Sequence, residues 1–320
     1  MKHRDDHPLL GDLTDMLEKN KLSRRDFIRY ATLLGISAAT ATQLAGVVLP
    51  AKASAATIRR GGVMRVASQV TKVTHPAQLS WITPSNQLRQ VSEYLTVTDR
   101  NNITRPLLLE SWKASEDLKT WTLNLRRGVL FNNGDEFVAD DVVFTMIEWL
   151  KKDVGSSLLG MVGSYLDPTG IEKVSPYQVK LHLKRPEIAV PEHLFHYPAL
   201  VLNHRTFEGD FIRRPHGTGP YTIETYLEGE RCVLKRRNDY WQKGADGKSL
   251  PYMDGMEFID MGTEMSPQIA GLQSGEFHVI ELGEAGGTDV FLALRNDKNI
   301  SCLLYTSPSP RDRTRSRMPS

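Results

Sequence analysis

Residues 121–129 read Trp121-Thr122-Leu123-Asn124-Leu125-Arg126-Arg127-Gly128-Val129. Apolar and polar side chains alternate over the first six positions, which predicts a strand with one buried face. A helix is predicted over residues 140–152, because its apolar side chains fall on one stripe. Aspartates at its start and lysines at its end suit the helix dipole. A strand followed by an amphipathic helix indicates a chain that mixes α and β structure.

The same kinds of pattern continue on both sides of this stretch. Alternating or β-rich runs predict strands over residues 62–67, 177–184, 221–226 and 231–237, the last two joined by the turn Glu228-Gly229-Glu230. Ser266-Pro267 is predicted to start a helix, with the serine as N-cap, and Gly275 to end it. An apolar strand is predicted directly after it, over residues 277–280. The order helix, glycine, strand is typical of the α/β class.

Composition excludes several classes of protein. Apolar residues make up 40% of the 320 positions and charged residues 24%, which fits neither a multi-span membrane protein nor a disordered chain. Two cysteines are too few for a disulfide scaffold or a cysteine-built zinc ribbon. Residues 1–53 carry a net +2 and residues 303–320 a net +3, so the body between them is at −3 although the whole chain is at +2. An acidic body argues against nucleic acid as a partner.

The N-terminus has the pattern of an export signal. Ser23-Arg24-Arg25-Asp26-Phe27-Ile28-Arg29 is a twin-arginine motif whose signal residues are Ser23, Arg24, Arg25 and Phe27, and an uncharged stretch follows over residues 30–50. Small residues from Ala53 to Ala56 offer cleavage sites. Residues 1–56 are therefore predicted to be a twin-arginine signal peptide, read by the twin-arginine export machinery, which leaves a soluble periplasmic protein. The alternative is a membrane anchor, but the threonines, Ser37 and Gln43 make a poor span.

The C-terminus changes composition abruptly. Thirteen of the residues 303–320 are Ser, Thr, Pro or Arg, with no hydrophobic period. The stretch resembles a translated adapter sequence, so we expect a non-native tail; the alternative is a basic tail for nucleic acid or membrane. We expect both ends of the chain to lie outside the fold.

Three blocks of residues, in order, carry a resemblance to a known family. The first block is Leu107–Trp112 followed by residues 121–129, 131–134 and 139–142, the second comprises residues 217–221, 229–231, 238–241 and 251–254, and the third is Leu272–Glu276. Over about residues 61–280 the chain resembles the extracellular solute-binding proteins of the peptide/nickel ABC importer family. One departure is Val138, where the family has a threonine that would cap the helix.

The resemblance implies a fold and a division into domains. The fold it implies is α/β and periplasmic-binding-protein-like (type II, two-lobed), with only the first lobe and its subdomain present. Residues 57–95 and 203–285 are expected to form the first lobe, and residues 96–202 a subdomain inserted in it. Residues 286–302 would start the crossover to a missing second lobe of about 150–200 residues.

Enzyme motifs are absent from the sequence. It contains no phosphate-binding loop, dinucleotide fingerprint, nucleophile elbow or zinc-protease motif. The spacing of His193, His196 and His204 matches no metal geometry. The acid pairs Asp135-Glu136 and Asp140-Asp141 fit a turn and a helix start better than acid–base catalysis. We predict no enzyme, no cofactor and no metal, and a buried structural role for Cys232.

Candidate ligand-binding residues follow the first and last strands. They are Thr71, His75 and Trp81 in the loop after the first strand, and Glu281 and Gly283 after the last. The alternative for each is an ordinary surface loop. The remaining large aromatics are expected to pack in the core rather than stack on a ligand: Trp112, Trp121, Tyr240 and Trp241.

The predicted function combines the export signal with the resemblance. The chain is expected to be the periplasmic solute-binding component of an ABC importer, with peptide as the default ligand, working with ABC permease and ATPase subunits. The alternatives are an exported enzyme whose catalytic half is missing and a ligand-sensing module for a receptor. A chain with only one lobe is expected to bind ligand poorly.

Overall fold

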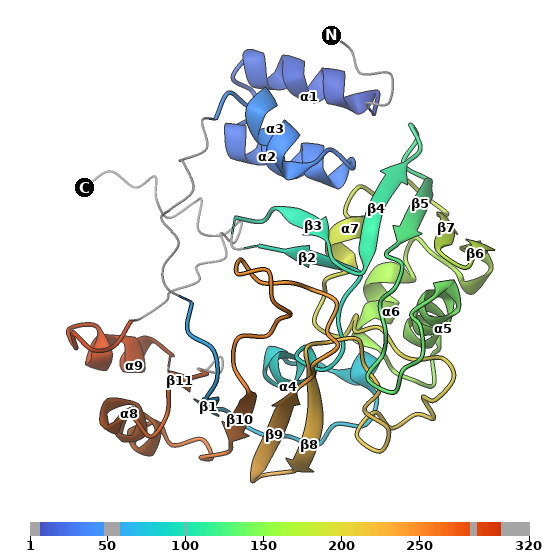
Figure 1. Ribbon diagram of the computed structural model, residues 1–320. Coiled ribbons are helices and arrows are strands. Elements are labelled where there is room, and N and C mark those ends of the chain that lie inside the picture. Colours follow the sequence, from blue (N-terminus) through green and yellow to red (C-terminus); the bar gives the residue numbers. More distant parts are fainter. Residues whose placement is uncertain (1–6, 48–57, 100, 282–286, 302–320) are drawn as a thin grey trace.

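The computed structural model describes residues 7–47, 58–99, 101–281 and 287–301 (Figure 1). Two sheets form the body, and three short helices from the N-terminal segment lie on one side of it. The mixed α/β class predicted from the sequence is confirmed.

The five-stranded sheet holds the first and last strands of the body. Its order is β11-β1-β10-β9-β8. Its strands are β1 (Val63–Ala67), β8 (Tyr221–Leu227), β9 (Arg231–Arg236), β10 (Gly255–Ile259) and β11 (Val279–Ile280). β1 runs parallel to both of its neighbours, β10 and β11, whereas β9 and β8 continue the sheet antiparallel. The elements around it are η1 (Pro76–Gln78), α4 (Ile82–Leu88), α8 (Met265–Ser274) and α9 (Gly287–Leu294).

The start of α8 differs from the sequence prediction. The helix begins at Met265 with Glu264 as N-cap, so Ser266 is not the cap. Pro267 is still tolerated, because the first-turn amides of a helix have no partner within the helix. Gly275 ends the helix at φ +79°, as predicted.

The second sheet is antiparallel throughout, in the order β4-β5-β7-β6. Its strands are β4 (Leu109–Ala114), β5 (Thr120–Leu125), β6 (Ile171–Ser175) and β7 (Gln178–His182), and its helices are α5 (Ala139–Leu150), α6 (Ser157–Val162) and α7 (Val190–His193). A 3₁₀ turn, η2 (Pro168–Gly170), precedes β6, and β2 (Thr96–Thr98) pairs with β3 (Thr104–Pro106) in a separate hairpin. Trp121, Leu123 and Leu125 point to the buried face of β5, as the alternation predicts. Val138 gives α5 no side-chain cap, but its amide donates to Asp141 Oδ2 at 2.8 Å.

A buried carboxylate and a buried arginine hold the segment after β9 in place. Glu93 accepts hydrogen bonds from Tyr240 Oη at 2.6 Å and from Trp241 Nε1 at 3.0 Å. Burial raises the pKa of Glu93. Arg237, nearby, is 6% exposed and donates to the carbonyls of Gly217, Gly219, Leu130 and Phe131. These contacts bring together segments that the sequence blocks place far apart in the chain, around Phe131, Gly217 and Tyr240.

Gly217 shows how tightly this junction is packed. A Cβ at position 217 would lie 2.0 Å from the carbonyl oxygen of Val91. Only glycine fits such a close approach of two backbones.

The N-terminal segment is folded where the structure describes it. α1 (Leu9–Glu18), α2 (Arg24–Leu33) and α3 (Ala38–Leu44) pack together around Phe27, Ala31 and Ala41. Ser23 caps α2 by accepting the amide of Asp26. The expectation that the N-terminal end lies outside the fold is therefore wrong for residues 7–47, because their apolar side chains fall on facing helical stripes. The stretch expected to be a tail, residues 303–320, lies outside the described residues.

Within the described ranges, every helix is too short or too polar to cross a membrane.

Candidate functional site

The carboxyl ends of three parallel strands meet at one edge of the five-stranded sheet. β1 ends at Ala67, β10 at Ile259 and β11 at Ile280. β10 lies on one side of β1 and β11 on the other. The carboxyl end of β1 is therefore a topological switch point of the sheet. In open α/β sheets, ligands bind outside the carboxyl ends of strands at such a point. We call this place the β1 edge: the residues Ser68–Thr71, Asp260 and Glu281, together with Trp81, Asn86 and Gln87 at α4.

Glu281 is the acidic group of the β1 edge. Ser68 Oγ donates to Glu281 Oε2 at 2.6 Å, and Asn86 Nδ2 donates to Glu281 Oε1. The backbone amide of Glu281 donates to the carbonyl of Ala67 at 2.9 Å. The side chain is half-buried, and its two oxygens accept one hydrogen bond each. A carboxylate offers about four acceptor positions, so this fixed group retains capacity for a further donor.

The loop after β1 is held from three sides. Gln87, fully buried in α4, donates from Nε2 to the carbonyl of Gln69 at 2.7 Å. Tyr226 Oη on β8 donates to the carbonyl of Thr71 at 2.7 Å. Asp260 Oδ2 accepts the amide of Val70 at 2.8 Å. The loop is therefore fixed before any ligand arrives, which lowers the entropy cost of binding.

A buried amide oxygen and an exposed aromatic ring lie in and just before α4. The Oδ1 atom of Asn86 is buried and has no hydrogen-bond partner among the described residues. Trp81, the residue before the helix, is 58% exposed, and its neighbour Ile82 is 47% exposed. Trp81 lies about 7–8 Å from Asn86 along the helix axis, at 1.5 Å per residue. An aromatic surface and polar groups thus belong to one short helix.

The structure brings together some of the predicted residues. Glu281 lies at the β1 edge, and Thr71 and Trp81 are exposed on the segments that border it. Gly283 lies outside the described residues.

The prediction for His75 is wrong. Its side chain is buried, with Nε2 3.1 Å from Glu148 Oε2 on α5 and Nδ1 accepting the amide of Ala77. The ring also packs edge-on against Phe207 at 4.8 Å between centroids. Burial lowers the pKa of this imidazole. His75 therefore stabilises the core under the loop and does not line the β1 edge.

Sequence reasoning missed Ser68, Asn86 and Gln87. The available signal was the polar pair Asn86-Gln87 inside an otherwise ordinary short helix. A glutamine that is fully buried needs partners, and here they are the backbone of the loop after β1.

The histidines considered for a metal site have separate partners. His193 Nδ1 lies 2.9 Å from Tyr165 Oη, and His204 Nδ1 lies 2.7 Å from Asp141 Oδ1. Over the described ranges, no cluster of three or more His, Cys, Asp or Glu side chains has the geometry of a metal site. Cys232 is buried in β9, and burial raises the pKa of its thiol to about 12, so it packs as a small apolar side chain.

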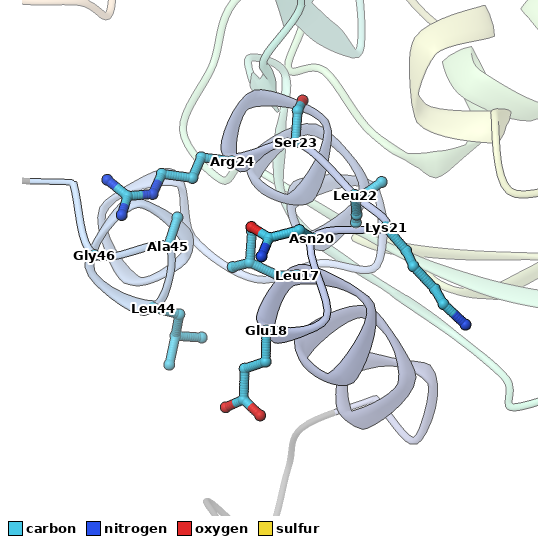
Figure 2. A pocket seen from close by; sticks show the side chains of 10 residues that line it. All are labelled: Leu17, Glu18, Asn20, Lys21, Leu22, Ser23, Arg24, Leu44, Ala45 and Gly46. Carbon is cyan, nitrogen blue, oxygen red and sulfur yellow. The ribbon is translucent and has the colours of Figure 1, made fainter.

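A hollow of about 530 Å³ lies away from the β1 edge, between the N-terminal helices (Figure 2). Its walls are the end of α1, the start of α2 and the end of α3. Figure 2 shows Lys21 and Arg24 pointing outward on opposite sides of it. We do not assign it to the site at the β1 edge, because it involves none of the body strands.

Comparisons with known proteins give the family and the fold of the chain. Residues 104–314 match the family described as bacterial extracellular solute-binding proteins, family 5 Middle. The glutathione-binding protein GsiB of Salmonella choleraesuis (strain SC-B67) is 30% identical over 181 residues, which are 56% of this chain and 34% of that protein. The nickel-binding periplasmic protein of Escherichia coli (strain K12) is 30% identical over 168 residues, or 50% and 31% of the two chains. The periplasmic binding protein DppA of Helicobacter pylori, solved in complex with the peptide STSA, matches with a TM-score of 0.62 and 23% identity over 74% of this chain and 50% of that one.

The family match covers about two thirds of the chain, so the chain belongs to family 5 of the bacterial extracellular solute-binding proteins. The resemblance inferred from the sequence blocks is confirmed. The fold is that of the type II periplasmic binding proteins. The chain spans about a third of the length of the two curated relatives named here.

Proposed function

We propose that this chain is the substrate-binding component of an ABC importer, which captures a small solute in the periplasm and delivers it to permease and ATPase subunits. The observation that carries the proposal is the β1 edge, where Glu281, Ser68 and Asn86 meet at the switch point of a family 5 fold. The family relatives are named for solute binding rather than for catalysis, which disfavours an enzyme.

The ligand class that we propose is a peptide. An extended peptide needs partners for its backbone N–H and C=O groups, and the edges of strands supply them without reading side chains. Its ammonium group needs an opposite charge, and Glu281 is a fixed carboxylate with unused acceptor capacity. The names of the relatives include a glutathione-binding protein and a nickel-binding protein, so nickel chelates are the competing class.

We also propose that residues 1–56 act as a twin-arginine signal and that the body is divided as the sequence suggests. Arg24 and Arg25 are exposed at the N-terminus of α2, beside the capping Ser23, which leaves the arginine pair accessible, whereas Phe27 is buried. The five-stranded sheet takes its strands from residues 63–67 and 221–280, and the second sheet takes its strands from residues 109–182. This supports a subdomain inserted between two segments of the first lobe.

The experiment is a thermal-shift screen against di- and tripeptides, glutathione and nickel–histidine. It is run on this chain and, in parallel, on the product of the source reading frame sequenced beyond codon 295. A ligand at 100 times its dissociation constant stabilises the protein by about 2.7 kcal/mol. Stabilisation by peptides that Glu281→Gln weakens supports the proposal. No stabilisation of the protein encoded by the source gene by any of these ligands would overturn it.

A further inference from the structure

A bidentate ion pair ties the N-terminal helices to the body. Arg29 on α2 donates from Nε to Glu192 Oε1 at 2.8 Å and from Nη2 to Glu192 Oε2 at 2.9 Å. Glu192 belongs to α7, which is 163 residues away in the sequence. Such fork-to-fork geometry is the strongest form of a side-chain ion pair and fixes orientation as well as distance.

The end of α2 is capped by the body. Trp112 Nε1 on β4 donates to the carbonyl of Leu33 at 3.0 Å, and this contact is buried. The last four carbonyls of a helix have no partner within the helix, so the indole satisfies a group that would otherwise be left unpaired. Gly35 follows at φ +94°, and a Cβ there would lie 2.7 Å from the carbonyl oxygen of Trp112. The close approach therefore depends on glycine at this position.

A third contact lies just before α1. His7 is 7% exposed, and its Nε2 lies 3.0 Å from the carbonyl oxygen of Ser115, just after β4. The carbonyl can only accept, so Nε2 carries the hydrogen, and Nδ1 is left to accept the amide of Leu9 at 3.2 Å. One imidazole therefore joins the start of α1 to the body.

The body side of these contacts is a composite surface, which we call the latch surface: Trp112, Ser115 and Glu192. Trp112 and Ser115 come from β4 and its end, whereas Glu192 comes from α7 after the whole second sheet. The latch surface therefore exists only after residues 109–193 have folded. Figure 1 shows the blue N-terminal helices beside this part of the body.

Docking divides the N-terminal segment into hidden and accessible parts. Phe27, Ala31 and Leu33 are at most 1% exposed, whereas Arg24 and Arg25 are exposed. The hollow in Figure 2 opens beside Ser23 and Arg24. The apolar end of α2 is thus covered while the arginine pair stays in reach of solvent, whereas Leu44 on α3 is 49% exposed.

We propose that the latch surface is a docking site for the chain's own residues 7–47, and that docking is an autoinhibitory contact that withholds part of the leader from the export machinery until the leader is released. The autoinhibition rests on the proposed role of residues 1–56 as an export signal. Docking forms only on a folded body, so it delays the export of folded chains. Export then requires the leader to leave the latch surface.

Hydrogen–deuterium exchange on the full 320-residue chain tests docking directly. Arg29→Glu and Glu192→Arg each place like charges in the ion pair, and the double variant restores it in reverse. Each single variant is expected to raise exchange at residues 26–36 about tenfold, and the double variant to return it toward the original rate. Glu172→Arg, which disrupts the exposed pair with His182 on the second sheet, is the matched control and should leave these residues unchanged.

Strands β5 and β7 report whether the body stays folded in each variant. If Glu192→Arg unfolds the body, the exchange of Arg29→Glu alone tests docking, because Arg29 lies on α2 and not in the body. Exchange at residues 26–36 that stays at the original rate in Arg29→Glu would overturn docking.

The rate of leader removal in cells tests the autoinhibition separately. Glu192→Arg leaves the leader sequence intact and is expected to speed processing several-fold. Processing at the original rate, with exchange showing a released leader, would overturn the autoinhibition and leave docking in place. No processing of any variant would contradict the signal role and the autoinhibition, whereas docking would still be decided by exchange.

Discussion

Tyr240→Phe is expected to destabilise the protein by about 1–3 kcal/mol, because it deletes the shortest hydrogen bond to the buried carboxylate of Glu93. Tyr240 Oη donates to Glu93 Oε1 at 2.6 Å, and the tyrosine is 7% exposed. Hydrogen bonds to charged groups contribute about 1.5–3 kcal/mol, and an unpaired buried acceptor costs about 1–3 kcal/mol. The phenyl ring itself keeps its packing, so no cavity cost adds to this figure.

The matched control is Tyr177→Phe. Tyr177 Oη also donates to a carboxylate, that of Glu136 at 2.8 Å, but on a part-exposed surface where water replaces the lost partner. Its expected cost is within about 0.5 kcal/mol. Urea denaturation followed by circular dichroism gives both values, provided that the m-value is unchanged. Equal costs for the two variants would refute the argument that burial sets the strength of the Glu93 contacts.

Three further predictions follow from local geometry. Burial raises the folded-state pKa of Glu93, so its carboxyl binds a proton more tightly in the folded state than in the unfolded state. The free energy of unfolding should therefore fall as the pH rises from the ordinary glutamate pKa to the raised pKa of Glu93. Denaturation of Glu93→Gln at a series of pH values should lack this fall. If the variant keeps it, Glu93 is not the group responsible. Gly217→Ala should cost several kcal/mol or prevent folding, since its Cβ would lie 2.0 Å from a backbone oxygen. Gly229→Ala, at a positive φ in open space, should cost only about 1 kcal/mol. Similar thermal midpoints for the two variants would contradict the argument from close packing at Gly217. Val138→Thr should stabilise by about 1 kcal/mol in urea, because it adds the missing N-cap hydroxyl to α5, and a loss of stability would show that the pocket around Val138 requires an apolar side chain.

Local patterns predicted the strands and helices well. The alternation of Trp121, Leu123 and Leu125 places them on the buried face of β5, and the Gly275 signal places the end of α8. Such signals are carried by residues close together in the chain, so one sequence is enough to read them. The cap of α8 was misplaced by two residues, because both Glu264 and Ser266 precede a plausible first turn.

Contacts between distant residues could not be read in this way. The orientation of His75 depends on Glu148, 73 residues later, and the sequence contains no sign of that pairing. The position of Glu281 at the β1 edge could be predicted because it directly follows a strand, but its partners Ser68 and Asn86 are 213 and 195 residues away. The docking of α2 could not be predicted for the same reason, since Arg29 and Glu192 are 163 residues apart in the sequence.

The central claim is that the β1 edge binds a small solute through Glu281. Calorimetric titration of the protein encoded by the source gene with a dipeptide, beside its Glu281→Gln and Glu276→Gln variants, tests it most directly. We expect saturable 1:1 binding that weakens at least tenfold in Glu281→Gln and stays unchanged in Glu276→Gln, whose carboxylate lies near Gly271 of α8. Peptide binding that is equally strong in all three proteins would contradict the role of Glu281, and no binding of any peptide would contradict the proposed ligand class.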